Sequence, residues 1–587
     1  MKKATLLACL LAAGLTLWPS ALHAQGQDIP PLLLQQDLPS VVTDLEARIP
    51  RLLMDARIPG LQAALIRDGQ VVWHGSFGLK NAATGGAVTD ETIFEAASFT
   101  KPFFAFYVMK LVEQGLLSLD KPLVGYASPE LLEKFLGHPL DEKGFRRDWF
   151  EKITIRQILS HSSGLPHGEQ ARPFPVFFEP GSKWKYSADG YFLLQKVIEA
   201  LKGDKLENLM QKEVLGPLGM TKSCLVWRDD YEKTMANGHD FFGKAEDFRK
   251  RTESHAGASL YTTAEDYAKF VCAVLNGDGI GPETLKAMLA PQIDMDKDNG
   301  LGWSLGFGTQ TDTHGLAIWQ WGDYGIFRNY VLAYPQEKTG VVYLTNSFYG
   351  LGICPELVAH SVGGQALGSI SLNYRPYDWP VYRFGWELAE KGPEAAAELP
   401  DLAKKFPKEF SKDGIGFLTA IFEDANRLAE SRALLQGYVK EYPRSGQAQL
   451  ALAKILAQMG DREQAWTYLK KAKRAKEDKV QARELKWNQQ YIQALNRPKK
   501  LKESYLRKLA GDYGVRHLEF RDGRLYYYRE GGRAPDYRPL VSMSKDTFIL
   551  ETEPAFRLKI GFDKKGNPIK AIGLYEEGRR DETLRTK

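Results

Sequence analysis

Residues 94–102 of this chain read FEAASFTKP, and an apolar run, 103–117, follows them. Within this stretch Ser98 precedes Lys101 by three residues, so a helix places both side chains on one face, one turn apart. The spacing suits a nucleophile and its proton acceptor, because a hydroxyl of ordinary pKa attacks a carbonyl only when a neighbouring group takes its proton. Pro102 is tolerated only in a first helical turn, so we expect a buried helix that begins near Ser98.

The Ser-x-x-Lys spacing is weak evidence by itself, since about two or three copies are expected by chance at ordinary residue frequencies. The chain contains three further copies, Ser118/Lys121, Ser182/Lys185 and Ser542/Lys545. Only Ser98 precedes a long apolar helix with a proline in its first turn. Its position therefore singles out Ser98 as the candidate nucleophile.

The composition excludes some classes of function. A length of 587 residues exceeds one typical core, so several domains are expected. Hydrophobic residues make up 43% and charged residues 26%, which is ordinary for a globular protein. The net charge of +5 is small and its residues are interspersed, so nucleic acid is not expected as the main partner.

Residues 1–24 are predicted to be a secretory signal peptide. Lys2 and Lys3 lead into an apolar run, 6–17, and small residues precede a cleavage site near Ala24. The run is too short to span a bilayer and no later segment is long and apolar enough, so no integral membrane span is expected. We predict a periplasmic or secreted protein.

No cofactor is expected. Beyond the signal peptide the chain keeps Cys224, Cys272 and Cys354, whose spacing does not resemble a metal site. We expect these cysteines to act as buried small hydrophobes. The sequence has no paired His ligands and no glycine-rich phosphate loop, so neither a metal nor a nucleotide is indicated.

Residues 25–375 are predicted to form one domain with strands at both ends. Strands at 61–67 and 71–77 flank a glycine-containing turn, Asp68-Gly69-Gln70. A helix-rich region, 120–290, separates them from three further predicted strands and a helical segment: 316–321, 327–334, 341–346 and 353–367. The pattern predicts an α+β domain whose single sheet is assembled from both ends of the segment.

After a linker marked by Pro376 and Pro380, residues 385–500 show helical periodicity. Two helical hairpins, 417–443 and 448–476, resemble tetratricopeptide repeats, although such arrays usually need three or more units. A plain helical spacer is the alternative reading. Self-association or protein contact through this region is a further possibility.

Residues 505–587 are predicted to form a small antiparallel barrel or sandwich. Strand patterns occur at 516–520, 524–529, 547–551, 556–562 and 569–575. The aromatic run 526–528 could be a ligand face, but alternate core and surface packing is the better explanation.

A second chemistry-bearing stretch, 178–191, reads FEPGSKWKYSADGY and contains Tyr186. A phenol near a lysine ammonium can have its pKa lowered from about 10, which would make it a base at neutral pH. Tyr186 is therefore a candidate for proton transfer to or from the reacting groups.

Five stretches together resemble the serine β-lactamase/penicillin-binding-protein superfamily, in its class C-like branch, which also includes D-amino-acid peptidases and carboxylesterases. They are 98–101 (SFTK), 153–165 (ITIRQILSHSSGL), 180–191, 216–220 (GPLGM) and 262–266 (TTAED). The resemblance runs from roughly 40 to 370. It implies a β-lactamase/transpeptidase-like antiparallel sheet with a helical subdomain.

The resemblance also implies roles for individual residues. Ser98 would be the nucleophile, Lys101 would assist its deprotonation, and Tyr186 would be the general acid/base. The third family motif would fall at 320–322, Gln320-Trp321-Gly322. The oxyanion hole would then be formed by the backbone N–H groups of Ser98 and Asp323.

Departures from the family pattern bear on the substrate. Ala188 replaces the asparagine that usually ends the second motif, and neutral Gln320 replaces a cation that pairs with a substrate carboxylate. Trp321 would reshape the pocket, and Asp323 would disfavour an anionic ligand. We therefore favour a carboxylesterase or a D-amino-acid amidase or peptidase, acting on a small or peptide-like acyl substrate, over a β-lactamase or a D-Ala-D-Ala carboxypeptidase.

Two other interpretations stay open. Ala188 and Gln320 would also fit a catalytically inactive binding module, whereas retention of Ser98, Lys101 and Tyr186 favours an enzyme. Alternatively, the helical region is the main functional part. His161, in the Leu-Ser-His-Ser-Ser-Gly stretch, is expected to be a buried structural imidazole that donates to backbone.

Overall fold

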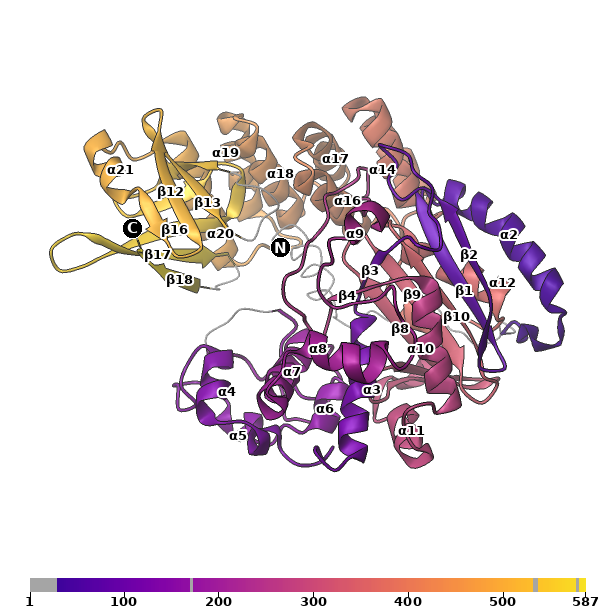
Figure 1. Cartoon of the computed structure of the whole chain (residues 1–587). Helices are drawn as coiled ribbons and strands as arrows, with labels where there is room; N and C mark the ends of the chain where they lie inside the picture. Colours follow the sequence, from indigo (N-terminus) through magenta and orange to yellow (C-terminus); the bar gives the residue numbers. More distant parts are fainter. Residues whose placement is uncertain (1–28, 169–172, 531–536, 577–579, 587) are drawn as a thin grey trace. The chain divides into compact units, whose positions relative to one another are not determined.

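The computed structural model describes residues 29–168, 173–530, 537–576 and 580–586, which fall into two compact units (Figure 1). One unit contains the described residues up to Asp378, and the other begins at Trp379. The predicted signal peptide, 1–24, lies outside the described residues.

The first unit is built on an eight-stranded antiparallel sheet in the order β2-β1-β10-β9-β8-β7-β6-β5. Its strands are β1 (Gly60–Arg67), β2 (Gln70–Gly78), β5 (Ile293–Asp296), β6 (Leu301–Trp303), β7 (Gly308–Asp312), β8 (Gly315–Asp323), β9 (Arg328–Tyr334) and β10 (Thr339–Thr345). The early strand β1 pairs with the late strand β10, for example Ala63 with Tyr343. The prediction of one sheet assembled from both ends is confirmed.

Helices cover both faces of this sheet. Figure 1 shows β1, β2 and β10 between α2 (Leu38–Asp55) and α12 (Cys354–Ser361) on one side and α10 (Ala264–Asn276) on the other. The remaining helices of four or more residues assigned as α in this unit are α3 (Thr100–Glu113), α4 (Pro129–Leu136), α5 (Arg147–Phe150), α6 (Ile155–Leu159), α7 (Ala188–Lys202), α8 (Leu206–Met210), α9 (Tyr231–Thr234), α11 (Pro282–Leu289) and α13 (Leu367–Ser371). The predicted helical segment 353–367 is therefore two helices, because α12 ends at Ser361.

The helix predicted to begin near Ser98 is α3, which begins at Thr100 and is buried on almost every side. Phe103, Phe104 and Phe106 are at most 1% exposed and belong to the main core. A helix that is apolar all round must be enclosed by other elements, and this burial fixes the position of its first turn.

The strands β3 (Phe94–Ala97) and β4 (Leu260–Thr262), together with β5, β6 and β7, were not predicted. Each is short, and none carries a clear alternation of apolar and polar residues. At Gly308 an added Cβ would lie 2.4 Å from the Trp319 ring, so packing on tryptophan dictates the residue there. Such strands depend on tertiary contact more than on local propensity.

The second unit begins with a helical region. Its helices are α14 (Pro380–Lys391), α15 (Leu399–Lys405), α16 (Lys412–Asp424), α17 (Leu428–Glu441), α18 (Gly446–Gln458), α19 (Arg462–Arg474), α20 (Ala482–Asn496) and α21 (Glu503–Leu509). The predicted helical hairpins correspond to α16–α17 and α18–α19. The likeness to tetratricopeptide repeats stays a prediction.

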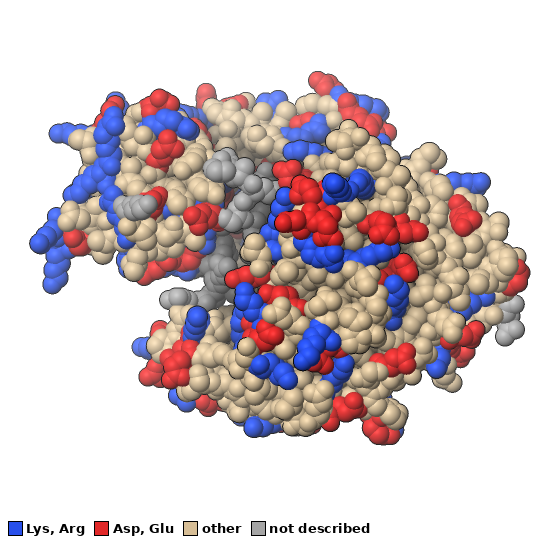
Figure 2. Space-filling view, viewed as in Figure 1, with Lys and Arg blue, Asp and Glu red and all other residues tan. Residues whose placement is uncertain are grey.

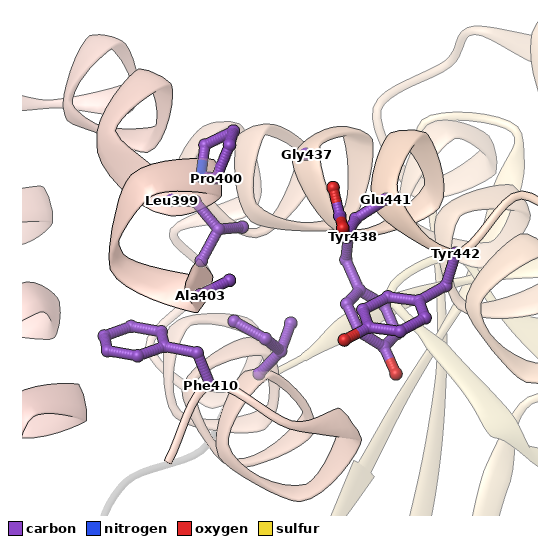
Figure 3. Close-up of a pocket in the computed structure, with 9 residues that line it drawn as sticks. Leu399, Pro400, Ala403, Phe410, Gly437, Tyr438, Glu441 and Tyr442 are labelled. Atoms are coloured by element: carbon purple, nitrogen blue, oxygen red, sulfur yellow. The ribbon is translucent and has the colours of Figure 1, made fainter. Parts of the chain in front are cut away.

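Figure 3 shows a pocket among α15, α16 and α17. Its lining is Leu399, Pro400, Ala403, Phe410, Ile415, Gly437, Tyr438, Glu441 and Tyr442. The lining is mainly apolar, and it contains none of the residues that the sequence singled out for chemistry.

The C-terminal part is an antiparallel sheet that forms a nearly closed barrel, with its strands in chain order. The strands are β11 (Gly511–Tyr513), β12 (Arg516–Arg521), β13 (Arg524–Arg529), β14 (Arg538–Ser542), β15 (Thr547–Leu550), β16 (Glu553–Phe562), β17 (Pro568–Tyr575) and β18 (Arg580–Leu584). Tyr527 is buried, whereas Tyr526 and Tyr528 are half-exposed on the other face. The predicted alternation of core and surface packing is present.

Charges are mixed over the surface. Figure 2 shows basic and acidic side chains interspersed over much of the visible face of the first unit. Within the described ranges, no helix is long and apolar enough to cross a membrane. The cysteines Cys224 and Cys354 are buried and Cys272 is half-buried, and all three are free thiols.

Candidate active site

Ser98 lies in a tight turn between β3 and α3 and is half-exposed. The preceding residue, Ala97, has a φ of 50°, a left-handed conformation that is unfavourable for a residue with a Cβ. The Thr100 hydroxyl donates to the Ala97 carbonyl at 2.7 Å and holds this turn. Local strain of this kind is retained where the surroundings fix the position of a functional side chain.

Lys101 is fully buried directly beside the serine. Its Nζ donates to Ser98 Oγ at 3.1 Å and to the Gly257 carbonyl at 2.8 Å. Burial lowers the pKa of Lys101 to about 7, while the negative charge of Asp189 raises it by a smaller amount. A substantial fraction of this amine is therefore neutral at physiological pH and can accept a proton from the Ser98 hydroxyl.

Tyr186 comes to the same place from a distant part of the chain. Its ring centroid lies 4.5 Å from Lys101 Nζ. Burial raises the pKa of Tyr186 above its usual value, and hydrogen bonds with Ser98 and Gln320 oppose that effect. The prediction of a lowered pKa is wrong, because the effect of burial outweighs that of the hydrogen bonds. The phenol stays protonated at neutral pH and is equipped to donate a proton.

We expect Tyr186→Phe to lower kcat by about 10²-fold or more for an alkyl ester, since a positioned general acid typically contributes that much. The ring packing against Trp321, at a centroid distance of 4.7 Å, is preserved in this variant. The loss should shrink for p-nitrophenyl esters, whose leaving group needs little protonation. Steady-state kinetics with both kinds of ester measure the difference, and equal losses would contradict a proton-donating role.

The predicted third motif lies on β8 beside the serine turn. Gln320 is fully buried, and its Nε2 donates to the Ser98 carbonyl at 2.9 Å and to the Tyr186 hydroxyl at 3.3 Å. The Trp321 ring packs on the Tyr186 ring and is only 9% exposed. Gln320 thus links the serine turn to the phenol with neutral hydrogen bonds.

Gly322 is required by the close approach of β8 to β3. A Cβ added at this position would lie 2.2 Å from the Ala96 carbonyl oxygen, which is backbone and cannot swing away. Because Ala96 precedes Ser98 by two residues, this contact sets the spacing between the serine turn and the end of β8.

Gly322→Ala is expected to destabilise the protein by about 1–3 kcal/mol, the usual cost of overpacking, and to lower kcat/KM by about tenfold. Urea unfolding and ester hydrolysis measure the two effects. Gly416→Ala is the matched control, since an added Cβ there meets nothing within 4 Å. An active, fully stable Gly322→Ala protein would refute the close contact.

The negative charge of Asp323, at the end of β8, is offset by an ion pair with Arg328. Its carboxylate accepts from Arg328 Nε at 3.2 Å and from the Tyr374 hydroxyl at 2.7 Å. It also accepts from the Gly325 N–H at 2.6 Å. The expectation that Asp323 disfavours an anionic ligand by its charge is therefore wrong. The assignment of its backbone N–H to an oxyanion hole stays a prediction.

The second motif forms the beginning of α7. Ser187 is the N-cap, and its Oγ accepts from the Gly190 N–H at 3.0 Å. The Ala188 N–H donates to His167 Nδ1 at 3.1 Å. At the position that carries asparagine in the family pattern, the Ala188 side chain thus offers only a methyl group. The Ala188 N–H is already hydrogen-bonded to His167.

His161 is fully buried, as expected for a structural imidazole. The direction of its backbone hydrogen bond is the reverse of the prediction, because Nδ1 accepts from the Ser187 N–H at 3.1 Å. Its ring packs on Tyr186 at a centroid distance of 4.2 Å. Burial and the charge of Lys101 lower the pKa of His161 well below its usual value, so the ring is neutral and supports the position of Tyr186.

Two residues of the site had no sequence signal. Gly257 supplies the carbonyl that binds Lys101 Nζ, and a backbone acceptor leaves no trace in side-chain patterns. Asn329 is fully buried on β9, and its Nδ2 donates to the Glu95 carbonyl at 3.0 Å while its Oδ1 accepts from the Thr345 N–H at 3.0 Å. Asn329 therefore ties β3 to the main sheet and would have been recognisable only from its partners.

In the part of the chain that the structure describes, no group of three or more His, Cys, Asp or Glu side chains is arranged to hold a metal ion.

Part of this chain is similar in sequence to a known protein family and to two proteins named as esterases. The family model described as Beta-lactamase matches residues 43–354, more than half of the chain. "Esterase EstB" of Burkholderia gladioli is 26% identical over 333 residues, which cover 47% of this chain and 81% of the esterase. "Lovastatin esterase" of Penicillium rubens is 27% identical over 278 residues, which cover 37% of this chain and 69% of that protein. A solved structure, D-alanine carboxypeptidase AmpC from Burkholderia cenocepacia, aligns with a TM-score of 0.44 and 19% identity over 53% of this chain and 95% of that chain.

Proposed function

Because this chain belongs to the beta-lactamase family, whose members are serine hydrolases, we propose that it cleaves an ester or amide through an acyl-enzyme formed on Ser98. The observation that carries the proposal is the hydrogen bond, at 3.1 Å, between Nζ of the fully buried Lys101 and Oγ of the half-exposed Ser98. An amine whose pKa is about 7 is well matched to general-base catalysis near neutral pH.

In acylation, neutral Lys101 Nζ accepts the Ser98 hydroxyl proton while Oγ forms a bond to the substrate carbonyl carbon. The carbonyl oxygen becomes an oxyanion, for which the N–H groups of Ser98 and Asp323 are the proposed donors. The tetrahedral intermediate then collapses and breaks the bond to the leaving group. The Tyr186 hydroxyl donates a proton to the leaving atom and regains one from the Lys101 ammonium.

In deacylation, a water molecule gives its proton to neutral Lys101 and its oxygen bonds to the acyl carbon. Collapse of the second intermediate breaks the bond to Ser98 Oγ. The proton returns to Oγ, and the acid product leaves. Each proton taken in a step is returned in the same step, so the cycle needs no cofactor.

The substrate class that we propose is that of a carboxylesterase or a D-amino-acid amidase or peptidase. Two relatives are named esterases. In addition, the neutral side chain of Gln320 cannot form a charge-assisted pair with a substrate carboxylate, as a cation at this position would. A β-lactamase or a D-Ala-D-Ala carboxypeptidase is the alternative. Export after cleavage of residues 1–24 is proposed from the sequence pattern alone.

Burst kinetics test the proposal. An enzyme that accumulates an acyl-enzyme should release one equivalent of p-nitrophenol rapidly from a slowly deacylating p-nitrophenyl ester, and intact-mass measurement should detect the acyl group. The binding-module alternative predicts neither burst nor adduct. Absence of both, over a panel of short and long acyl chains, would reject the proposed function.

A further inference from the structure

Two guanidinium groups pack on the ring of one tyrosine beside the proposed site. Arg249 Cζ and Arg251 Cζ each lie 4.8 Å from the centroid of the Tyr324 ring. A guanidinium at this distance is attracted by the negative face of the aromatic ring, and this attraction favours a fixed position for the cation. Arg249 is half-exposed, so its donors are accessible to a ligand.

Tyr324 connects the two backbone segments that frame the reacting groups. It directly follows Asp323, whose N–H is the second proposed oxyanion donor. Its hydroxyl donates to the Ala258 carbonyl, and the neighbouring residue, Gly257, accepts from Lys101 Nζ at 2.8 Å. The arginine pair is therefore linked through Tyr324 to the backbone segment that binds Lys101 Nζ.

The charges of these groups are not balanced. Arg251 lies 3.7 Å from the buried carboxylate of Glu95, which offsets its charge. Asp323 is already paired with Arg328. No carboxylate lies within ion-pair distance of Arg249 in the residues that the structure describes, so this guanidinium is a cation packed on an aromatic ring without a partner of opposite charge.

The position of Tyr324 indicates which part of a substrate would meet Arg249. Gln320 and Tyr324 are at opposite ends of the same short segment, and Gln320 contacts the Tyr186 hydroxyl. In the proposed mechanism Tyr186 protonates the leaving group. A leaving group protonated by Tyr186 would lie on the Gln320 side, and an acyl chain on the opposite side of the scissile bond would extend toward Tyr324.

We propose that Arg249 binds an anionic group on the acyl chain, so that the preferred substrates are esters or amides of an acid with a second carboxylate or comparable anion. This inference rests on the proposed function. A stacked guanidinium can donate two parallel hydrogen bonds to a carboxylate, which gives orientation as well as charge. Neutral Gln320 on the leaving-group side and cationic Arg249 on the acyl side together define the selectivity.

The test uses two esters of similar length, mono-p-nitrophenyl glutarate and p-nitrophenyl valerate, with release of p-nitrophenol as the readout. Arg249→Met should lower kcat/KM for the glutarate ester at least tenfold and change that for the valerate ester less than twofold. Lys250→Met is the matched control, because this neighbouring exposed cation is paired with Glu232. It should leave both values unchanged.

The ionic strength gives a second readout, because a preference for an anion should weaken when salt screens the pair. Equal losses for both esters in Arg249→Met, or wild-type kcat/KM values that do not favour the glutarate ester, would overturn the inference and leave the proposed function standing. Absence of any Ser98-dependent release from either ester would instead reject the proposed function, and the inference with it.

Discussion

Ser98→Ala is expected to lower kcat/KM for p-nitrophenyl esters by about 10⁴-fold or more, since removal of the nucleophile abolishes the covalent route and leaves only binding and electrostatic effects. The hydroxyl is half-exposed and its partner is Lys101 Nζ, so loss of one hydrogen bond should cost at most about 1 kcal/mol of stability. Steady-state hydrolysis and a urea melt on the same preparation measure both effects.

The sequence supplies matched controls for this variant. Ser118 and Ser542 also precede a lysine by three residues, so Ser118→Ala and Ser542→Ala test the same spacing elsewhere in the chain. Both should retain full activity. Hydrolysis that survives Ser98→Ala undiminished would show that the nucleophile is misassigned.

Lys101→Met should lower kcat/KM by about 10³-fold or more and remove the pH dependence that the amine imposes. In the wild-type protein the neutral amine is the base, so kcat/KM should rise with pH and reach a plateau above a pKa of about 7. A profile of the wild-type enzyme between pH 5 and 9 measures this. A wild-type profile that is flat over that range would contradict the role of Lys101.

A stability measurement separates loss of the base from loss of the fold. The pKa of Lys101 is about 7 in the folded protein and 10.5 as its ordinary value, so the unfolded chain binds more protons between these limits. Stability from this group therefore rises with pH across that window. Lys101→Met removes the rise, and urea midpoints at pH 7 and pH 10 should differ less in the variant than in the wild type.

Local signals predicted much of the fold. The turn after β1 was predicted from Asp68-Gly69, and both residues have positive φ, 51° and 68°, as a type I′ hairpin turn requires. The run after Pro102 predicted a buried helix correctly. The short strands β3 and β4 were missed because they have only four and three residues and show no clear alternation of apolar and polar side chains.

The site was predictable in its residue types and less so in its electrostatics. Ser98, Lys101, Tyr186 and Gln320 are brought together as the motifs suggested. The pKa of Tyr186 was predicted with the wrong sign, since the sequence does not reveal how completely neighbouring rings bury the phenol. Asp323 was predicted to disfavour an anionic ligand, because the sequence does not reveal that a neighbouring cation offsets its charge. Its partner, Arg328, is opposite it across the β8–β9 pair.

The most direct test of the convergence of these groups is the site and rate of labelling by a fluorophosphonate. We predict a single adduct on the peptide that contains Ser98, with a labelling rate that rises with pH through about 7 and is lost in Lys101→Met. An adduct on any other residue, or labelling at an undiminished rate without the lysine amine, would contradict the account.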